Sequence, residues 1–197
     1  LSPLAAETED ERFPPYDNTA EVAAYYKSKP DFFQFKTIAD LPADLKWLDG
    51  MDLPEFSDPK AQKGGTLHYF QPSFPPSLRT VGPNANSSFR SEHWDDLCIY
   101  QALPHPNVQG GYTPGTCNQW APADDHRSCF YKIDPTAKFS NGEPIRVDDY
   151  FMMFYIMQSP YIQDPWYNNE YSTKFKSIIK YDDLTFAIVF PDPKPDP

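Results

Sequence analysis

Residues 139–150 constrain the fold of this chain more than any other stretch. They read Phe-Ser-Asn-Gly-Glu-Pro-Ile-Arg-Val-Asp-Asp-Tyr. Asn141-Gly142 predicts a tight turn, because glycine adopts a positive φ without steric cost. Pro144 favours an extended segment, and Asp148-Asp149 place two carboxylates at the positive end of a helix. The stretch therefore predicts a turn, a short strand and a helix over 148–158, which Pro160 ends.

Further strings follow one another in order between residues 63 and 190. They are Lys63–Leu67, Pro76–Asn86, Trp120 with Asp124-Asp125 and Cys129–Phe139, and Lys180–Val189. Together with residues 139–150, they resemble the sequence signature of the extracellular solute-binding proteins of family 5. These proteins are the peptide-binding receptors of ABC importers. Leu41–Trp47 resembles an N-terminal extension of the branch that includes the microcin C uptake receptor.

The resemblance implies an α+β fold. We expect the first-lobe portion of a two-lobed, Venus-flytrap binding protein of the cluster C type, with an inserted subdomain. Residues 1–62 would be an N-terminal extension that wraps the surface, and 63–96 the first part of the lobe I main subdomain. Residues 97–188 would form the inserted subdomain of lobe I, and 189–197 would begin the return to lobe I. Because members of the family are much longer than 197 residues, we expect an N-terminal fragment without the second lobe.

The resemblance also implies a function, which is peptide capture for uptake without catalysis or a cofactor. The expected partners are a peptide and the cognate ABC permease in the inner membrane, with the receptor itself a monomer. Oligosaccharides, nickel complexes and opines remain open as ligands, because the same fold serves receptors for them. Leu1–Ala6 resembles the end of a cleaved secretory signal, so we expect a periplasmic protein.

The loop over residues 83–90 is the predicted ligand contact. A bound peptide must satisfy one donor and one acceptor per residue, and short polar side chains can do so for any peptide sequence. The candidate residues are Asn84, Asn86, Ser87, Ser88 and Arg90, of which the arginine suits a C-terminal carboxylate. An ordered turn built by Asn and Ser is an equally open reading of the same loop.

Composition narrows the class of function. A net charge of −11 disfavours nucleic acids and anionic membranes as partners, since both require clustered Lys and Arg. Acidity, together with an aromatic content of 16%, motivates one alternative, a secreted carbohydrate-binding or carbohydrate-active domain. A glycosidase would need two carboxylates about 5–9 Å apart, and no pair is placed to argue for one. Asp124-Asp125-His126 indicates turn chemistry rather than a metal or acid-base site.

The remaining expectations concern secondary structure, core residues and cysteines. We predict helices over 20–26, 37–47 (broken by Pro42) and 91–103, a loop over 161–171, and strands over 66–70, 118–123, 128–133, 175–181 and 185–190. The predicted core residues are Trp120, Phe130, Phe139, Phe151 and Ile188. Cys98, Cys117 and Cys129 match no zinc spacing and are expected to be small buried residues. No disulfide is assigned among them, although a hairpin turn at 124–127 would separate Cys117 from Cys129.

Overall fold

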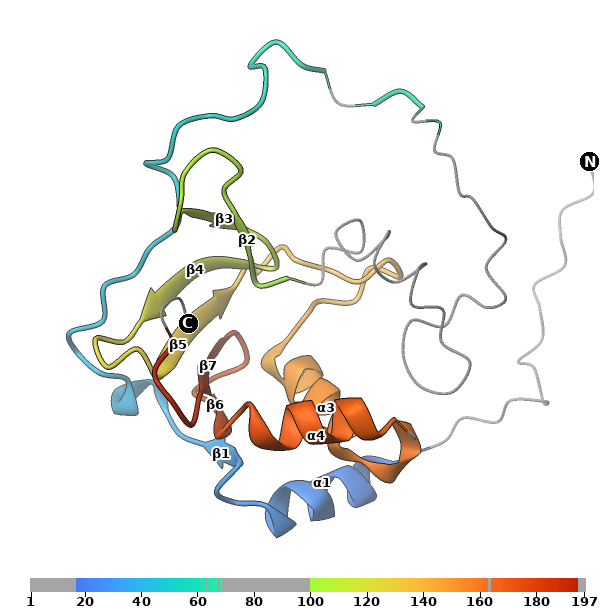
Figure 1. Ribbon diagram of the computed structural model, residues 1–197. Helices are drawn as coiled ribbons and strands as arrows, with labels where there is room; N and C mark the ends of the chain where they lie inside the picture. Colours follow the sequence, from blue (N-terminus) through green and yellow to red (C-terminus); the bar gives the residue numbers. More distant parts are fainter. Residues whose placement is uncertain (1–16, 63, 67, 69–99, 163, 195–197) are drawn as a thin grey trace, which may run out of the picture.

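The computed structural model describes residues 17–62, 64–66, 68, 100–162 and 164–194. These residues form an α+β fold, as predicted, around one five-stranded mixed sheet (Figure 1). The strand order is β1 (Phe33–Phe35), β6 (Ser177–Lys180), β7 (Thr185–Val189), β5 (Ser128–Ile133) and β4 (Cys117–Pro122). Only β1 pairs in parallel, with β6, and the other neighbours are antiparallel. A second, two-stranded sheet joins β2 (Ala102–Pro104) to β3 (Tyr112–Pro114).

The β4–β5 hairpin has the predicted strands and register. Trp120 pairs with Tyr131 and Pro122 with Cys129, whereas Cys117 lies opposite Ile133 at the far end. Cys117 and Cys129 are consequently separate, buried free thiols. Cys98 lies outside the described residues. The tight turn holds His126 at a φ of 55°, and the Asp125 carboxylate accepts a hydrogen bond from the Arg127 N–H at 2.8 Å. The Asp-Asp-His string is therefore turn chemistry, as expected.

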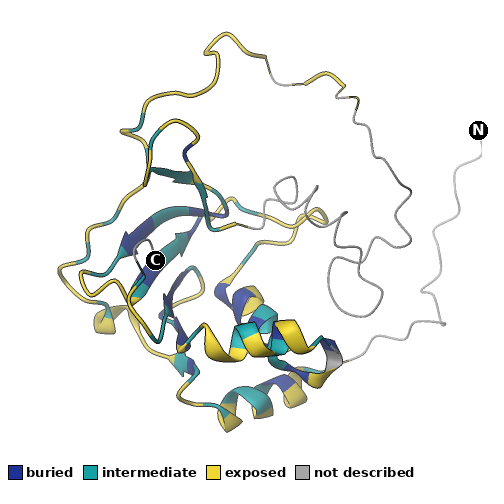
Figure 2. Ribbon diagram, viewed as in Figure 1, coloured by how far each residue is buried: buried dark blue, intermediate teal, exposed yellow. Residues whose placement is uncertain are grey.

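Three helices cover part of one face of the sheet. These are α1 (Thr19–Ser28), α3 (Val147–Gln158) and α4 (Pro165–Thr173). The buried core lies between them and the sheet (Figure 2), with Phe151, Phe154 and Phe186 fully buried. The Phe151 ring packs against Tyr26 of α1 and Phe33 of β1 with centroids 5.7 and 5.6 Å apart, which is favourable aromatic geometry. The Phe154 ring packs against Phe32, just before β1, at 5.6 Å. None of the described helices is long and apolar enough to span a bilayer.

The opposite face of the sheet is covered by an irregular segment, residues 37–48, which we call the strap. Leu41, Leu45 and Trp47 of the strap pack on a small core that includes Phe130 and Tyr181. The strap ends by pairing with β4, where Leu48 and Trp120 exchange two backbone hydrogen bonds of 2.8 and 3.0 Å. These contacts explain how a segment with little regular structure is held on the sheet.

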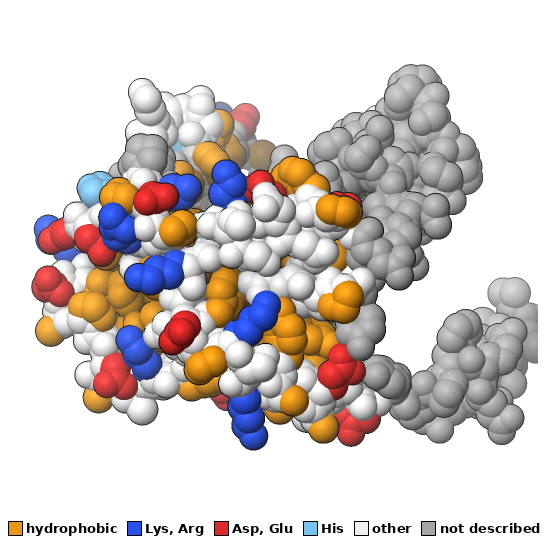
Figure 3. Space-filling view, turned by 60° about the horizontal axis from the view of Figure 1, so that its bottom comes forward, with side chains coloured by type: hydrophobic (Ala, Val, Ile, Leu, Met, Phe, Trp, Pro, Cys, Tyr) orange, Lys and Arg blue, Asp and Glu red, His pale blue; other side chains and the backbone are white. Residues whose placement is uncertain are grey.

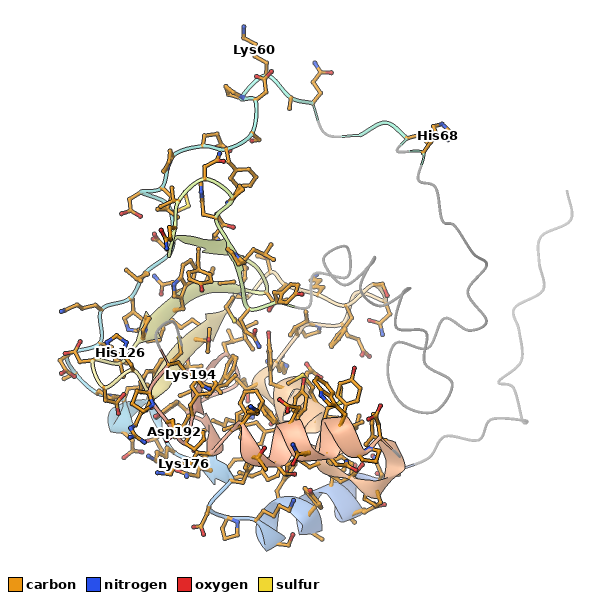
Figure 4. All side chains as sticks on the ribbon, in the orientation of Figure 1. Lys60, His68, His126, Lys176, Asp192 and Lys194 are labelled. Atoms are coloured by element: carbon orange, nitrogen blue, oxygen red, sulfur yellow. The ribbon has the colours of Figure 1, made fainter. Side chains whose placement is uncertain are left out.

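The chain after β7 also lies against the hairpin turn. The N–H of Lys194 donates to the carbonyl of His126 at 2.7 Å, and the N–H of Phe190 donates to the carbonyl of Arg127 (Figure 4). Figure 3 views the molecule from the side of α1, where acidic and basic side chains alternate with exposed apolar ones. No single charge sign dominates this face, although the chain as a whole is acidic.

Several sequence predictions were wrong. Residues 161–171 are not a loop, because a short 3-10 helix over Pro160–Ile162 is followed by α4. Asp164 caps α4 by accepting hydrogen bonds from the N–H groups of Trp166 and Tyr167, and Pro165 occupies the first helical turn. The 37–47 segment keeps only a 3-10 turn, Ile38–Asp40, because proline at 42 interrupts a longer helix.

Three further predictions concern single residues or partly described segments. Phe139 is 45% exposed, so it is not a core residue, whereas Trp120, Phe130, Phe151 and Ile188 are buried as predicted. Tyr100–Leu103 is not helical, since β2 begins at Ala102, and the rest of the 91–103 prediction lies outside the described residues. Thr66 and His68 are in no strand, and the remainder of 66–70 lies outside as well. The proposed boundaries at 62, 96 and 188 stay predictions, although β1, from within 1–62, pairs with β6.

Candidate functional site

The predicted ligand-contact residues lie outside the described residues. These are Asn84, Asn86, Ser87, Ser88 and Arg90. Their contact with a ligand therefore stays a prediction. The described part of the chain contains two other candidate sites, which are the signature residues around α3 and a groove on the sheet.

The signature residues meet around Lys180, at the end of β6. The Lys180 ammonium lies 2.8 Å from an oxygen of Asp148 on α3 and 3.0 Å from an oxygen of Asp183 on the β6–β7 turn. The N–H of Val147 also donates to the carbonyl of Asp183 at 3.0 Å. The start of α3 is thus fastened to the turn between two strands. These carboxylates serve the fold rather than a ligand.

The helix start is stabilised despite the arginine at its N-cap position. The Asp149 carboxylate accepts a hydrogen bond from the N–H of Arg146 at 2.8 Å, which satisfies one of the free donors of the first turn. Gly142 has a φ of 90°, and the Asn141 side chain accepts from the N–H of Glu143 at 3.0 Å, as the turn prediction required. The third helical position thus stabilises the start of α3, where the N-cap side chain itself makes no capping hydrogen bond.

Charge pairing shifts the ionisation of this cluster. The hydrogen bond from Lys180 holds the pKa of Asp183 below its usual value. Burial alone would lower the pKa of Lys180, but its hydrogen bonds with Asp148 and Asp183 outweigh burial and raise it. Lys180 and Asp183 are therefore both charged at neutral pH.

A groove of about 260 Å³ lies where the helix layer does not reach, over β4 and β5. We call it the aromatic groove and define it by six lining residues: Gly50, Asp52, Gln101, Tyr112, Trp120 and Tyr131. Trp120 and Tyr131 are neighbours across the hairpin, and the Tyr112 ring from β3 stands edge-on to Trp120 with centroids 6.4 Å apart. The sheet thus supplies the floor, and residues 48–53 and the β2–β3 hairpin supply the walls.

Close packing at Gly50 positions one wall of the aromatic groove. Gly50 has a φ of 69°, and a Cβ at this position would overlap the carbonyl oxygen of Tyr112 and lie 3.3 Å from the Trp120 ring. Only glycine combines that backbone conformation with that approach. The wall is therefore set by a backbone contact between segments that are distant in the sequence.

His105 connects Pro54, which follows the wall formed by residues 48–53, to the β2–β3 hairpin. The ring is buried, its Nε2 lies 2.8 Å from the carbonyl oxygen of Pro54, and its Nδ1 accepts from the N–H of Asn107 at 3.1 Å. Since a carbonyl only accepts, Nε2 is the ring nitrogen that donates to Pro54. The Phe56 ring packs edge-on against it at 5.3 Å. Both nitrogens are therefore engaged in holding structure.

Two buried cysteines and Tyr131, on β4 and β5, have raised pKa values. Burial raises the pKa of the Cys117 thiol to about 12 and that of the Cys129 thiol to about 11, so neither is a thiolate at neutral pH. Burial likewise raises the pKa of Tyr131, which stays a neutral phenol. Asp52 is the groove's only carboxylate among the described lining residues, whereas a glycosidase requires two. Within the described part of the chain, no cluster of His, Cys, Asp or Glu is arranged to hold a metal ion.

Comparisons with known proteins give distant, partial likenesses. No protein-family model matches the chain, and no curated protein matches its sequence. Among solved structures, HbpA2 from Haemophilus parasuis is 17% identical over 61% of this chain and 26% of its own, with a TM-score of 0.47. Haemophilus influenzae OppA, in complex with the peptide RPPGFSPFR, is 19% identical over 51% of this chain and 23% of its own, with a TM-score of 0.41.

A third solved structure extends the comparison to another kind of ligand. AgaA from A. tumefaciens R10, in complex with agropinic acid, is 19% identical over 62% of this chain and 23% of its own, with a TM-score of 0.45. The chain thus spans about a quarter of the length of these proteins. Two of the similar structures are described as a substrate-binding protein or domain of an ABC transporter.

Proposed function

We propose that this chain is part of the substrate-binding component of an ABC importer, with peptides as the captured substrate. It would work in the periplasm after removal of a secretory signal and deliver its ligand to a membrane permease. In this proposal the described residues belong to the first lobe of a two-lobed receptor. The likeness of Leu41–Trp47 to the microcin C receptor branch would make the strap a feature of that branch.

The observation that carries the proposal is the meeting of two signature strings at Lys180. Asp148 and Lys180 are separated by 32 positions, yet they form a bidentate contact of 2.8 and 2.9 Å. The hairpin around Trp120 and the turn at Gly142 also have the predicted form. The strings that fall within the described residues are therefore used together as one structural unit, which favours the receptor interpretation over a chance match.

Isothermal titration of the full-length gene product and of the 197-residue chain, against a mixed peptide pool, tests the proposal. A two-lobed receptor gains affinity by enclosing its ligand from both sides. We therefore expect saturable binding by the full-length protein and weak or no binding by the 197-residue chain. A parallel titration with mixed oligosaccharides tests the carbohydrate-binding alternative.

The predicted contact at Arg90 allows a sharper version of this titration. In the full-length protein, Arg90→Met should weaken binding of peptides with a free C-terminal carboxylate and leave C-terminally amidated peptides unaffected. Lys60→Met, an exposed charge change elsewhere, is the matched control. Oligosaccharide binding in place of peptide binding would reject the peptide proposal, and tight peptide binding by the 197-residue chain would reject the two-lobe argument.

A further inference from the structure

The aromatic groove has an electrostatic asymmetry that the proposed function does not use. Its described lining contains one carboxylate, Asp52, and no Lys, Arg or His. The Asp52 side chain is exposed and has no hydrogen bond or ion pair within the described part of the chain. Because a cleft lined by one sign of charge concentrates the opposite sign, the groove favours a cation over an anion.

The aromatic residues add a second preference of the same kind. Trp120 is only 5% exposed, so the rings that a ligand can reach are those of Tyr112 and Tyr131, which are half-buried. The faces of Tyr rings carry negative partial charge and attract ammonium groups. Lys132, which follows Tyr131 on β5, engages the opposite face of the sheet, where its Nζ lies 4.1 Å from the centroid of Trp47. It also donates to Gln119 at 3.1 Å. Lys132 therefore places no positive charge in the aromatic groove.

Size completes the description of the ligand. A volume of about 260 Å³ lies below the roughly 300–1,000 Å³ of sites for drug-sized ligands. A small molecule with an apolar body fits the aromatic floor, and one positive charge matches Asp52. Gln101 adds an amide that can bond a hydroxyl.

We propose that the aromatic groove binds a small alkylammonium cation, with its apolar body against the half-buried Tyr112 and Tyr131 and its charge near Asp52. This site does not depend on peptide capture, and it draws on none of the residues predicted at 83–90. Its ligand class is set by charge and shape together, so an uncharged molecule of the same shape should bind less well.

Choline chloride and its uncharged carbon isostere, 3,3-dimethyl-1-butanol, are the matched probes. Both are titrated into the full chain by calorimetry at constant ionic strength, because salt screens an exposed charge. We expect saturable binding of choline that is about tenfold tighter than that of the isostere. Equal binding of the two would overturn the proposal, as would the lack of saturable choline binding.

Two charge-neutralising variants separate the groove from the overall acidity of the chain. Asp52→Asn should weaken choline binding about tenfold and leave the isostere unchanged. Asp44→Asn removes a similar exposed carboxylate from the strap, outside the aromatic groove, and should bind choline like the parent chain. Equal weakening by both variants would point to net charge alone and overturn the site, and tighter binding of glucose than of choline would overturn the ligand class.

Discussion

Gly50 and Gly110 form a matched pair for testing how the wall of the aromatic groove is held. Both have a positive φ, 69° and 72°, so an alanine at either position meets the same backbone penalty. That penalty is about 1 kcal/mol after the smaller entropy of the unfolded chain is counted. At Gly110 nothing lies within 4 Å of an added Cβ, whereas at Gly50 the Tyr112 carbonyl oxygen and the Trp120 ring are in the way.

The difference between the two variants therefore measures the packing of residues 48–53 on β3. Overlap in a well-packed region costs about 1–3 kcal/mol. We thus expect Gly50→Ala to lower the free energy of unfolding by about 2–4 kcal/mol and Gly110→Ala by about 1 kcal/mol. Urea unfolding followed by circular dichroism gives both values, provided that the m-value is unchanged. Equal losses would refute the close approach at Gly50 and, with it, this description of the groove wall.

Three other predictions follow from burial and charge. Trp120→Ala should lower the free energy of unfolding measured in urea by about 3–5 kcal/mol, because Trp120 is only 5% exposed. Trp166→Ala, at a side chain that is 59% exposed, should change the free energy of unfolding little. Lys180 lowers the pKa of Asp183, so the stability that this pair contributes is present above the unfolded carboxyl pKa of about 3.9 and is lost as the pH falls further. When the unfolding free energy is measured against pH, Asp183→Asn should reduce this loss at acidic pH. A loss as large as that of the parent chain would contradict the pairing. Cys117 should react with a thiol reagent at neutral pH only after unfolding, since burial raises its pKa to about 12. Peptide mass spectrometry with and without denaturant measures the labelling of this residue. Rapid labelling of the native chain would contradict the prediction.

The elements that could be predicted from the sequence are those with strong local signals. The β4–β5 hairpin combines alternating apolar residues with a turn-forming string, which together fix its register. The helix after Arg146 has acidic residues in its first turn and a proline after its end. In both cases the residues close in sequence are also the ones that make the deciding contacts.

The missed elements had weaker or competing signals. Helix α4 is rich in Trp, Tyr and Asn, which have modest helix propensity, so 161–171 looked like a loop. Its helical signal was the Asp164-Pro165 start, followed by Tyr167 and Tyr171 on one face. Phe139 was expected in the core because it belongs to the signature, but it stands in a short turn closed by hydrogen bonds to Gly142 and Glu143, which leaves its ring exposed.

The aromatic groove could not be predicted, because no local pattern connects its parts. Asp52, Tyr112 and Tyr131 come from three separate segments, and their association depends on the approach at Gly50 and on the pairing of Leu48 with Trp120. Long-range backbone contacts of this kind leave little trace in a single sequence. A close contact at a positive-φ glycine is the one local clue, since it marks a place where another segment can approach.

The signature carboxylates and the carboxylate of the aromatic groove differ in how far they are engaged by other groups of the fold. Asp148 and Asp183 are engaged by Lys180, and the Asp182 carboxylate accepts from the N–H groups of Leu184 and Thr185. A ligand could use these oxygens only by competing with contacts that fasten α3 to the sheet. These signature carboxylates therefore hold α3 and the β6–β7 turn in place. The Asp52 carboxylate in the aromatic groove differs from them, because it is exposed and has no hydrogen bond or ion pair within the described residues.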